Sequence, residues 1–363
     1  TLLTAVKVRE DPGFAVPSDK WRLDIGQLKV ENFGPYYSFF SYYKVLFFKY
    51  FYWRKQADNL IKEHDVILLR TPSPNISLIT KSAIRFGKPL ILIFPGNMEK
   101  CSTRIIGNRG LKRVFYLALN KLLIRQEQNC ARNSKLIYVY SSELFERFKD
   151  NNSRVRKTLS PQVCLKDFVY REDTCQSPEI RLLRVGWITP TKGLEYLFEA
   201  LALLLSKGIK VRIEIAGKEG QSIGYKLRLE KVLENLKIKD KVDFIGWIPY
   251  DQIHEIYLRN DIQVISSVSE GIPRCIAEGA ARGLPLVSTM AGGSSDLLTH
   301  ERNSLLVPSK DSKSLALAIE RLIKDDKLRK NLIRGGYCLA RSVSFENLGE
   351  QLISEIQNVV CTK

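Results

Sequence analysis

Residues 266–285 read SSVSEGIPRCIAEGAARGLP, and this stretch decides the fold. The residues before it, DIQVI at 261–265, are typical of a short buried strand, and the stretch itself predicts a helix over 274–282. Gly283 and Pro285 end that helix before the next apolar run. A strand, a glycine-containing loop and a helix start direct backbone N–H groups outwards, which attracts phosphate.

Two carboxylates flank this helix start, Glu270 on the loop and Glu278 inside the helix. Carboxylates accept hydrogen bonds from sugar hydroxyls, while N–H groups donate to phosphate oxygens, so the combination suits a phosphorylated polyol. The alternative is an ordinary strand–helix–strand unit whose two glutamates are solvated.

The whole string resembles the donor-site signature of the retaining glycosyltransferases of family four, E-G-x-P-x-x-x-x-E-A-x-A-x-G-x-P. The matching residues are Glu270, Gly271, Pro273, Glu278, Ala280, Gly283 and Pro285. Gly279 stands where the family has alanine, which weakens the helix slightly. The resemblance implies an α/β protein of the GT-B type, in which two Rossmann-like, doubly wound domains face each other across a cleft.

Alternating strand and helix patterns along the chain favour parallel sheets. We expect an acceptor-side domain over 1–178 and a donor-binding domain with terminal helices over 179–363, joined by an irregular linker at 150–180. Such enzymes normally begin with a strand, a glycine-containing loop and a helix, and we do not find these at the start. We therefore expect the sequence to be incomplete at its N-terminus. Expected strands include 2–8, 65–69, 90–94, 135–140, 184–188, 210–216 and 242–247.

The composition is that of a globular chain: 44% of its 363 residues are hydrophobic, and no run reaches the length of a membrane-spanning helix. The seven cysteines are scattered with no C-x-x-C pair, and the three histidines are far apart. This pattern fits a reducing compartment and argues against a disulfide framework or a zinc site. We expect no metal and no cofactor other than a nucleotide-sugar substrate.

The positive charge lies mostly in the first half of the chain. Residues 1–178 hold 30 basic and 16 acidic side chains, whereas 179–363 hold 27 and 23. An acidic partner is expected for the first half, and nucleic acid, anionic lipid and an anionic acceptor all qualify. Because we find no nucleic-acid-binding motif, we expect no nucleic-acid partner.

An aromatic segment stands out within that basic half. Residues 33–53 hold 13 of the chain's 35 aromatic residues. The basic residues interleaved with or following them are Lys44, Lys49, Arg54 and Lys55. The segment is either a core helix packed through aromatic rings or an interfacial helix that lies on a membrane. The second interpretation predicts a cytoplasmic protein attached to the inner face of the membrane.

The resemblance also implies roles for individual residues. Lys192, in VGWITPTKG at 185–193, matches the family's pyrophosphate-binding lysine, and Trp187 replaces its usual arginine. Glu278 would accept hydrogen bonds from the nucleotide ribose, and Glu270 would contact the transferred sugar. Lys192 and Glu270 are therefore the expected catalytic residues.

The remaining expected site residues are loop positions next to strand ends. The backbone N–H groups of Gly271, Ile272 and Arg274 would face the sugar and phosphates, because Pro273 has no N–H to donate. The other candidates on the donor side are Gly186, Trp187, Gly246 and Trp247, with the last two in the base pocket. Gly96 and Asn97 match the acceptor-side loop, but the family's histidine is absent there.

The implied reaction moves a sugar from a nucleotide-sugar to a hydroxyl of a glycan or lipid-linked acceptor, in polysaccharide or glycolipid synthesis. The leaving phosphate assists the incoming hydroxyl, so the anomeric configuration is retained without a protein nucleophile. Two other interpretations stay open: an inactive partner subunit that binds sugar nucleotides, and, on charge alone, a nucleic-acid-binding protein.

Overall fold

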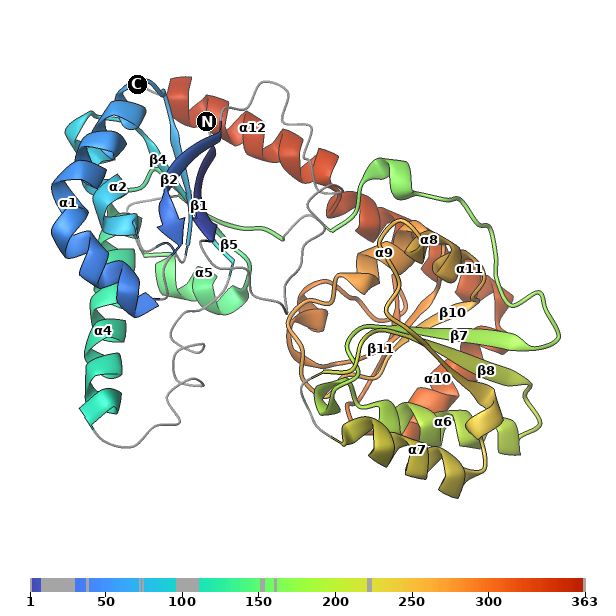
Figure 1. Ribbon diagram of the computed structural model, residues 1–363. Helices are drawn as coiled ribbons and strands as arrows, with labels where there is room; N and C mark the ends of the chain where they lie inside the picture. Colours follow the sequence, from blue (N-terminus) through green and yellow to red (C-terminus); the bar gives the residue numbers. More distant parts are fainter. Residues whose placement is uncertain are drawn as a thin grey trace. The chain divides into compact units, whose positions relative to one another are not determined.

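The computed structural model describes residues 2–7, 30–36, 39–71, 73, 75–95, 111–150, 154–159, 162–220 and 224–361, with side chains from residue 50 onwards except at 111–120, 295, 360 and 361. Its internal contacts divide the chain into two units. One comprises Thr1–Thr158 with Ile356–Lys363, and the other comprises Leu159–Glu355 (Figure 1).

The division falls earlier than the predicted boundary between 178 and 179, because the segment after residue 162 is bonded to the second unit. The Val169 N–H donates to the Ala281 carbonyl at 3.0 Å. The Arg329 guanidinium donates twice to the Asp173 carboxylate, at 2.6 and 2.9 Å.

The first unit contains a four-stranded parallel sheet in the order β3-β4-β5-β6 and a separate parallel pair, β1 and β2. Its strands are β1 Leu2–Lys7, β2 Val30–Tyr36, β3 Ile67–Arg70, β4 Leu90–Phe94, β5 Leu136–Val139 and β6 Arg154–Lys157. Its helices are α1 Phe39–Lys62, α2 Ile76–Arg85, α4 Leu111–Arg132 and α5 Ser142–Phe148. Strand β6 corrects the predicted linker, because its residues pair with β5. The Ser141 hydroxyl caps α5 by accepting the Leu144 N–H at 3.3 Å.

The aromatic segment divides between two elements, because residues 33–36 belong to β2 and the helix begins at Phe39. From residue 50 onwards one side of α1 packs into the core: Trp53, Ala57 and Ile61, four residues apart, are all buried. Phe51 and Tyr52 lie on the other side, 81% and 59% exposed. The core interpretation therefore holds for one face of the helix, while the outer face keeps two exposed aromatic side chains.

The second unit is a doubly wound sheet of six parallel strands, in the order β12-β11-β10-β7-β8-β9. The chain starts in the middle with β7, proceeds outwards through β8 and β9, then returns to β10 beside β7 and continues the other way. The strands are β7 Ile180–Val185, β8 Val211–Ala216, β9 Val242–Gly246, β10 Ile262–Ile265, β11 Leu286–Thr289 and β12 Leu305–Val307. This is the predicted α/β fold with parallel sheets.

Helices cover both faces of this sheet. Helices α6, α7 and α10 lie on one face and α8, α9 and α11 on the other (Figure 1). Their bounds are α6 Leu194–Ser206, α7 Tyr225–Leu236, α8 Ile253–Leu258, α9 Cys275–Ala281, α10 Ser312–Lys324, α11 Asp326–Ser342 and, after them, α12 Phe345–Cys361. The sequence analysis missed α11, which is capped by Asp325.

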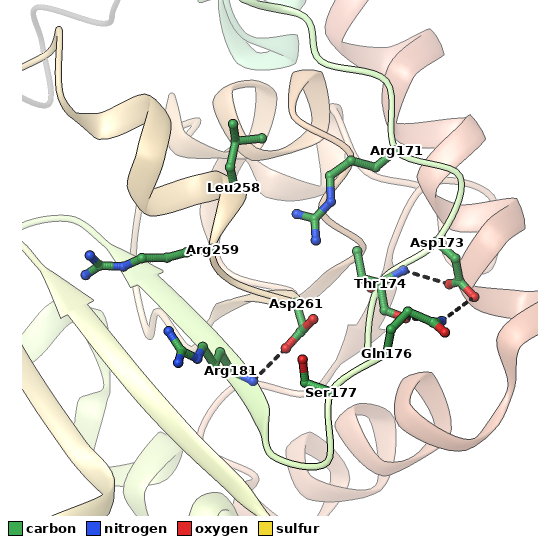
Figure 2. Close-up of a pocket in the computed structure, with 9 residues that line it drawn as sticks. All are labelled: Arg171, Asp173, Thr174, Gln176, Ser177, Arg181, Leu258, Arg259 and Asp261. Atoms are coloured by element: carbon green, nitrogen blue, oxygen red, sulfur yellow. Dashed lines mark hydrogen bonds between the residues drawn. The ribbon is translucent and has the colours of Figure 1, made fainter.

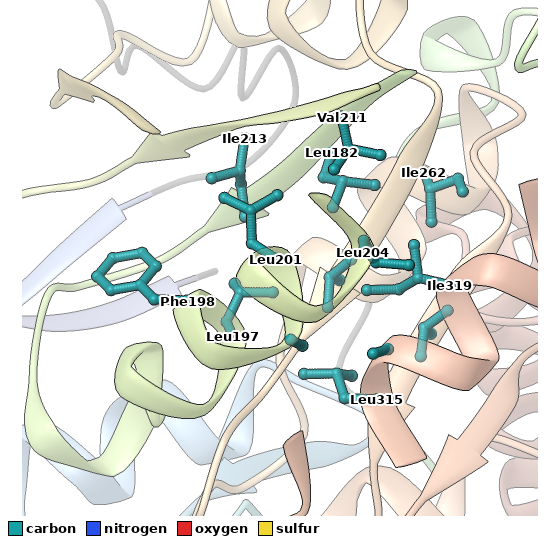
Figure 3. Packing of buried hydrophobic residues seen from close by; sticks show 14 of the residues in the cluster. Leu182, Leu197, Phe198, Leu201, Leu204, Val211, Ile213, Ile262, Leu315 and Ile319 are labelled. Carbon is teal, nitrogen blue, oxygen red and sulfur yellow. The ribbon is translucent and has the colours of Figure 1, made fainter. Parts of the chain in front are cut away.

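Leucine spacing explains why α6 folds against the sheet. Leu194, Leu197, Leu201 and Leu204 recur every three or four residues, so they share one helical face and are all buried. With Phe198 they pack against β7, β8 and α10 in the largest core cluster (Figure 3). Burying such a side chain contributes about 1.5–3 kcal/mol, which fixes the sheet that carries the site.

Candidate functional site

The candidate site lies at the point where the strand order of the second unit reverses. Strands β7 and β10 are neighbours there, and the connections that follow them lead to opposite parts of the sheet. In open α/β sheets ligands bind outside the carboxyl ends of such strands. The two loops that leave these ends are bonded together, because the Thr191 carbonyl accepts the Val268 N–H at 2.8 Å and the Ser266 hydroxyl donates to the Lys192 carbonyl at 2.9 Å.

The Glu270 carboxylate is the centre of this cluster. One oxygen forms an ion pair with the Lys192 ammonium and the other accepts a hydrogen bond from Ser267. Both charged side chains are largely enclosed, with 15% of Lys192 and 14% of Glu270 exposed. The structure therefore brings together two residues that are 78 positions apart in the sequence.

A buried arginine, Arg184, stands behind Glu270 and was not predicted from the sequence. Its side chain is only 2% exposed, and it donates to the Ser267 hydroxyl at 3.1 Å and to the Val185 carbonyl. Its guanidinium lies 4.0 Å from the second oxygen of Glu270. Two cations thus surround one carboxylate, so the cluster has a net positive charge. The sequence feature that could have revealed this residue is an arginine inside the apolar run IRLLRV at 180–185. Charged side chains are almost never fully buried unless they are paired, so such an arginine indicates a buried partner.

A glycine loop after β11 supports the backbone of Glu270. The Gly293 N–H donates to the Glu270 carbonyl at 3.3 Å. A Cβ on Gly292 would lie 1.7 Å from that same carbonyl oxygen, and the φ angle of Gly292, 61°, is in the left-handed region. Only glycine allows this approach.

Glu278 lies in α9 with a different partner, and no hydrogen bond joins it to Glu270 within the described residues. The Tyr257 hydroxyl donates to its carboxylate at 2.8 Å. Complete burial raises the pKa of Tyr257 well above its ordinary value, and the nearby Glu278 charge raises it further. The phenol therefore stays protonated and donates to one of the two carboxylate oxygens.

The thiol of Cys275 lies beside these carboxylates at the start of α9. Burial raises its pKa to about 12, an effect that the Arg184 charge opposes. The thiol therefore stays protonated near neutral pH and does not act as a nucleophile.

The structure explains why glycine replaces the expected alanine at 279. A Cβ on Gly279 would lie 2.0 Å from the amide oxygen of Gln263. Gln263 is completely buried in β10, and its amide nitrogen donates to the Cys275 carbonyl at 2.8 Å, so its position is fixed. Gly279 is therefore matched to this glutamine.

We expect Gly279→Ala to lower the free energy of unfolding by about 1–2 kcal/mol. Alanine gains about 1 kcal/mol of helix propensity, but overpacking a core costs about 1–3 kcal/mol and a 2.0 Å approach is severe. Chemical denaturation measures the difference. Gln263→Val in the same chain removes the obstructing amide and is expected to restore the lost stability. A single variant more stable than wild type would contradict this account.

The two tryptophans lie just after the carboxyl ends of two strands of the same sheet, β7 and β9, which β8 separates. Trp187 follows β7 and is 58% exposed, and Trp247 follows β9 and is 59% exposed. Lys218, after β8, places its ammonium 5.3 Å from the Trp247 ring centre. Gly186 and Gly246 are joined through β8, since the Gly186 N–H donates to Ala216 and the Gly246 carbonyl accepts from Gly217.

The predicted backbone donors have no competing partner. Within the described part of the second unit, no hydrogen bond uses the N–H groups of Gly271, Ile272 or Arg274. Gly96 and Asn97 lie outside the described residues, so their prediction is untested. Among the side chains that the structure describes, no three of the metal-binding types cluster together.

Comparison with known proteins agrees with this geometry. Residues 171–338 match the family described as glycosyl transferases group 1. This segment resembles a glycosyltransferase domain. It contains the Glu270 cluster, the Tyr257–Glu278 pair and both tryptophans.

Curated relatives are also glycosyltransferases. An uncharacterized glycosyltransferase of Methanocaldococcus jannaschii is 29% identical over 180 residues, which are 49% of this chain and 45% of the relative. The lipopolysaccharide core biosynthesis glycosyltransferase LpsE of Rhizobium meliloti is 30% identical over 156 residues, 43% of each chain. The chain spans about half the length of the curated relatives it matches.

Solved structures show the same fold over most of the chain. The Anabaena protein HepE, crystallised with UDP, has a TM-score of 0.67 at 17% identity, covering 91% of this chain and 86% of its own. The lipopolysaccharide outer core galactosyltransferase WaaB has a TM-score of 0.60 at 16% identity, covering 90% and 85%. The chain thus has the α/β fold of GT-B glycosyltransferases.

Proposed function

We propose that the protein is a retaining glycosyltransferase that moves a sugar from a nucleotide-sugar donor to a hydroxyl group. The observation that carries this proposal is the position of the Lys192–Glu270–Arg184 cluster at the strand-order switch, where α/β sheets bind nucleotides. Its net positive charge suits the donor diphosphate, and the free N–H groups of the adjacent loop add hydrogen-bond donors.

Each cluster residue has a role in the proposed reaction. The Lys192 ammonium contacts the diphosphate and stabilises the charge that develops as the bond to the sugar breaks. Glu270 accepts a hydrogen bond from a sugar hydroxyl, and Glu278 accepts from the ribose. Arg184 is enclosed behind Glu270, so it holds that carboxylate in place through Ser267.

The proposed step exchanges two bonds at the anomeric carbon. The bond from this carbon to the phosphate oxygen breaks, and its electron pair stays on the phosphate. The acceptor hydroxyl attacks from the same face, and its proton passes to the departing phosphate oxygen. The new glycosidic bond therefore has the configuration of the donor.

The proposed donor is a uridine nucleotide-sugar. Solved structures of the same fold include complexes of HepE with UDP, with UDP-glucose, and with UDP and glucose. For this chain, Trp187 and Trp247 provide exposed ring faces near the cluster on which a base can stack.

The test follows the anomeric proton of the product by NMR, with a panel of nucleotide-sugars and a mixture of glycan and lipid-linked acceptors. Retention of the donor configuration supports the proposal, and an inverted product contradicts the mechanism. Nucleotide-sugar binding without transfer or hydrolysis for any pair would instead favour the inactive partner subunit.

The acceptor is proposed to be a glycan or lipid-linked molecule met at an anionic membrane surface on the cytoplasmic side. Relatives include LpsE, named for lipopolysaccharide core biosynthesis, and WcaL of Escherichia coli, a putative colanic acid biosynthesis glycosyltransferase. The first 178 residues carry most of the excess positive charge. None of the helices in the described ranges is long and apolar enough to cross a membrane, so the proposal is attachment through α1, with Phe51 and Tyr52 on its exposed side.

We expect the chain to float with anionic liposomes at low salt and to be released at high salt. Each basic residue near an anionic surface contributes about 1 kcal/mol within a Debye length, so four substitutions are expected to abolish flotation. The variant replaces Lys44, Lys49, Arg54 and Lys55 by glutamine. A matched control replaces four lysines of the second unit, Lys210, Lys231, Lys313 and Lys327. Equal loss in both variants, or no flotation of the wild type, would contradict attachment through α1.

A further inference from the structure

A second pocket lies at the opposite end of the same sheet. It has a volume of about 290 Å³ and forms where the segment before β7 passes the end of α8 (Figure 2). Arg181 near the start of β7 and Asp261 just before β10 line it, so both strands lead away from the pocket towards the Glu270 cluster. At about 3.3 Å per residue, the six residues of β7 separate the two sites by roughly 20 Å.

The carboxylates that line the pocket already have their partners. Asp261 accepts the backbone N–H groups of Cys175 at 3.0 Å and Arg181 at 2.9 Å, one on each oxygen. Asp173 accepts two hydrogen bonds from Arg329, one from Nε and one from Nη2. Neither aspartate forms an ion pair with an arginine that faces the pocket.

The three arginines that line the pocket keep hydrogen-bond donors to spare. The Arg171 guanidinium makes one hydrogen bond, to the Asn260 carbonyl at 3.0 Å, and it points towards the middle of the pocket (Figure 2). Among the described residues the Arg181 guanidinium makes no hydrogen bond or ion pair, although its charge helps to lower the pKa of the Glu179 carboxyl. Arg259 donates from Nε and Nη2 to Glu214, at 3.0 and 2.9 Å. Its third nitrogen, Nη1, remains as a donor for a ligand.

Charge at the pocket is therefore positive. The three arginines of the lining exceed its two aspartates by one charge. Glu214 and Arg329, which pair with Arg259 and Asp173 from outside the lining, add one charge of each sign. Hydroxyl and amide groups from Thr174, Gln176 and Ser177 complete the lining, and Leu258 is the one apolar side chain among the described lining residues. Such a lining disfavours an apolar ligand and suits an anion.

We propose that this pocket binds a compact tetrahedral oxyanion, either free phosphate or the phosphoryl group of a small metabolite. Guanidinium forks match phosphate oxygens in pairs, and Arg171 and Arg181 approach the pocket from adjoining parts of the chain before and at the start of β7. A volume of about 290 Å³ is at the lower limit of small-molecule sites, about 300 Å³, which favours a small phosphate compound over a nucleotide-sugar. The site is separate from the Glu270 cluster and does not depend on the function proposed for that cluster.

Calorimetric titration of the full chain with inorganic phosphate tests the proposal, with potassium chloride of equal ionic strength as the reference. Glycerol 2-phosphate, titrated in the same way, separates free phosphate from a phosphoryl group on a metabolite. The key variant is Arg181→Gln, because this exposed guanidinium makes no hydrogen bond or ion pair among the described residues, so its loss is expected to leave the fold intact. Arg302→Gln, another exposed arginine of the same unit, is the matched control.

We expect phosphate binding in the wild type, at least tenfold weaker binding in Arg181→Gln and unchanged binding in Arg302→Gln. Binding no stronger than the chloride reference would overturn the proposal. So would equal losses in the two arginine variants, which indicate general charge attraction.

Discussion

Lys192→Ala is expected to lower kcat for sugar transfer by about a hundredfold to a thousandfold, while donor affinity falls less than tenfold. Electrostatic groups aimed at a developing charge typically contribute this much to the rate. The ground state gains less from the lysine, because its ammonium is already paired with Glu270 before the donor arrives. The charge matters most when the bond to the phosphate breaks.

Steady-state kinetics at saturating donor separate the two effects, since kcat then reports the chemical step and calorimetry gives the affinity. The control is Lys231→Ala, an exposed lysine on α7 that is expected to change neither quantity. Removing Lys192 also frees Glu270, so a Glu270→Gln, Lys192→Ala double variant checks that an unpaired carboxylate is not the cause. Unaltered turnover in Lys192→Ala would show that the lysine only neutralises Glu270.

Glu278→Ala is expected to weaken donor binding about tenfold to a hundredfold. A hydrogen bond to a charged group contributes about 1.5–3 kcal/mol, and each 1.4 kcal/mol changes an affinity tenfold. The carboxylate is held by the buried Tyr257 hydroxyl, which leaves its other oxygen for the nucleotide. Calorimetric titration of the variant with the donor measures the loss.

Tyr257→Phe is the matched comparison for Glu278, because it keeps the carboxylate and removes only the hydroxyl that orients it. We expect this variant to lose less than tenfold in donor affinity. The alanine variant leaves the Tyr257 hydroxyl buried without its partner, so its thermal stability is measured alongside. A Glu278→Ala variant that remains folded and binds the donor like the wild type would remove this residue from the site.

Most elements of the second unit were predicted from the sequence, with α11 as an exception, because each is marked by a pattern of neighbouring residues. The leucine spacing of α6 and the apolar run of β10 each report on a few neighbouring residues. Strand β6 was missed because RVRK has no clear apolar alternation, and only its pairing with β5 reveals it. The position of the domain division was also beyond local reasoning, because it depends on contacts such as that of Asp173 with Arg329.

The motif residues of the candidate site could be identified from the sequence, whereas the side chains that contact them could not. Glu270, Glu278 and Lys192 were identified by resemblance, and the structure pairs Lys192 with Glu270. The partners Arg184 and Tyr257 lie outside any motif, so their roles depend on which side chains the fold brings together. The reason for glycine at 279 could not be predicted either, because it depends on the contact of Gly279 in α9 with Gln263 in β10.

Hydrogen–deuterium exchange with and without a nucleotide-sugar tests whether the donor binds at the carboxyl ends of β7 and β10. The N–H groups of Gly271, Ile272 and Arg274 have no hydrogen bond in the described chain, so they exchange rapidly without ligand. We predict that a saturating donor slows exchange in peptides that cover 268–276 and leaves peptides of α7 unchanged. Calorimetric binding of the donor with no protection over 268–276 would contradict the account.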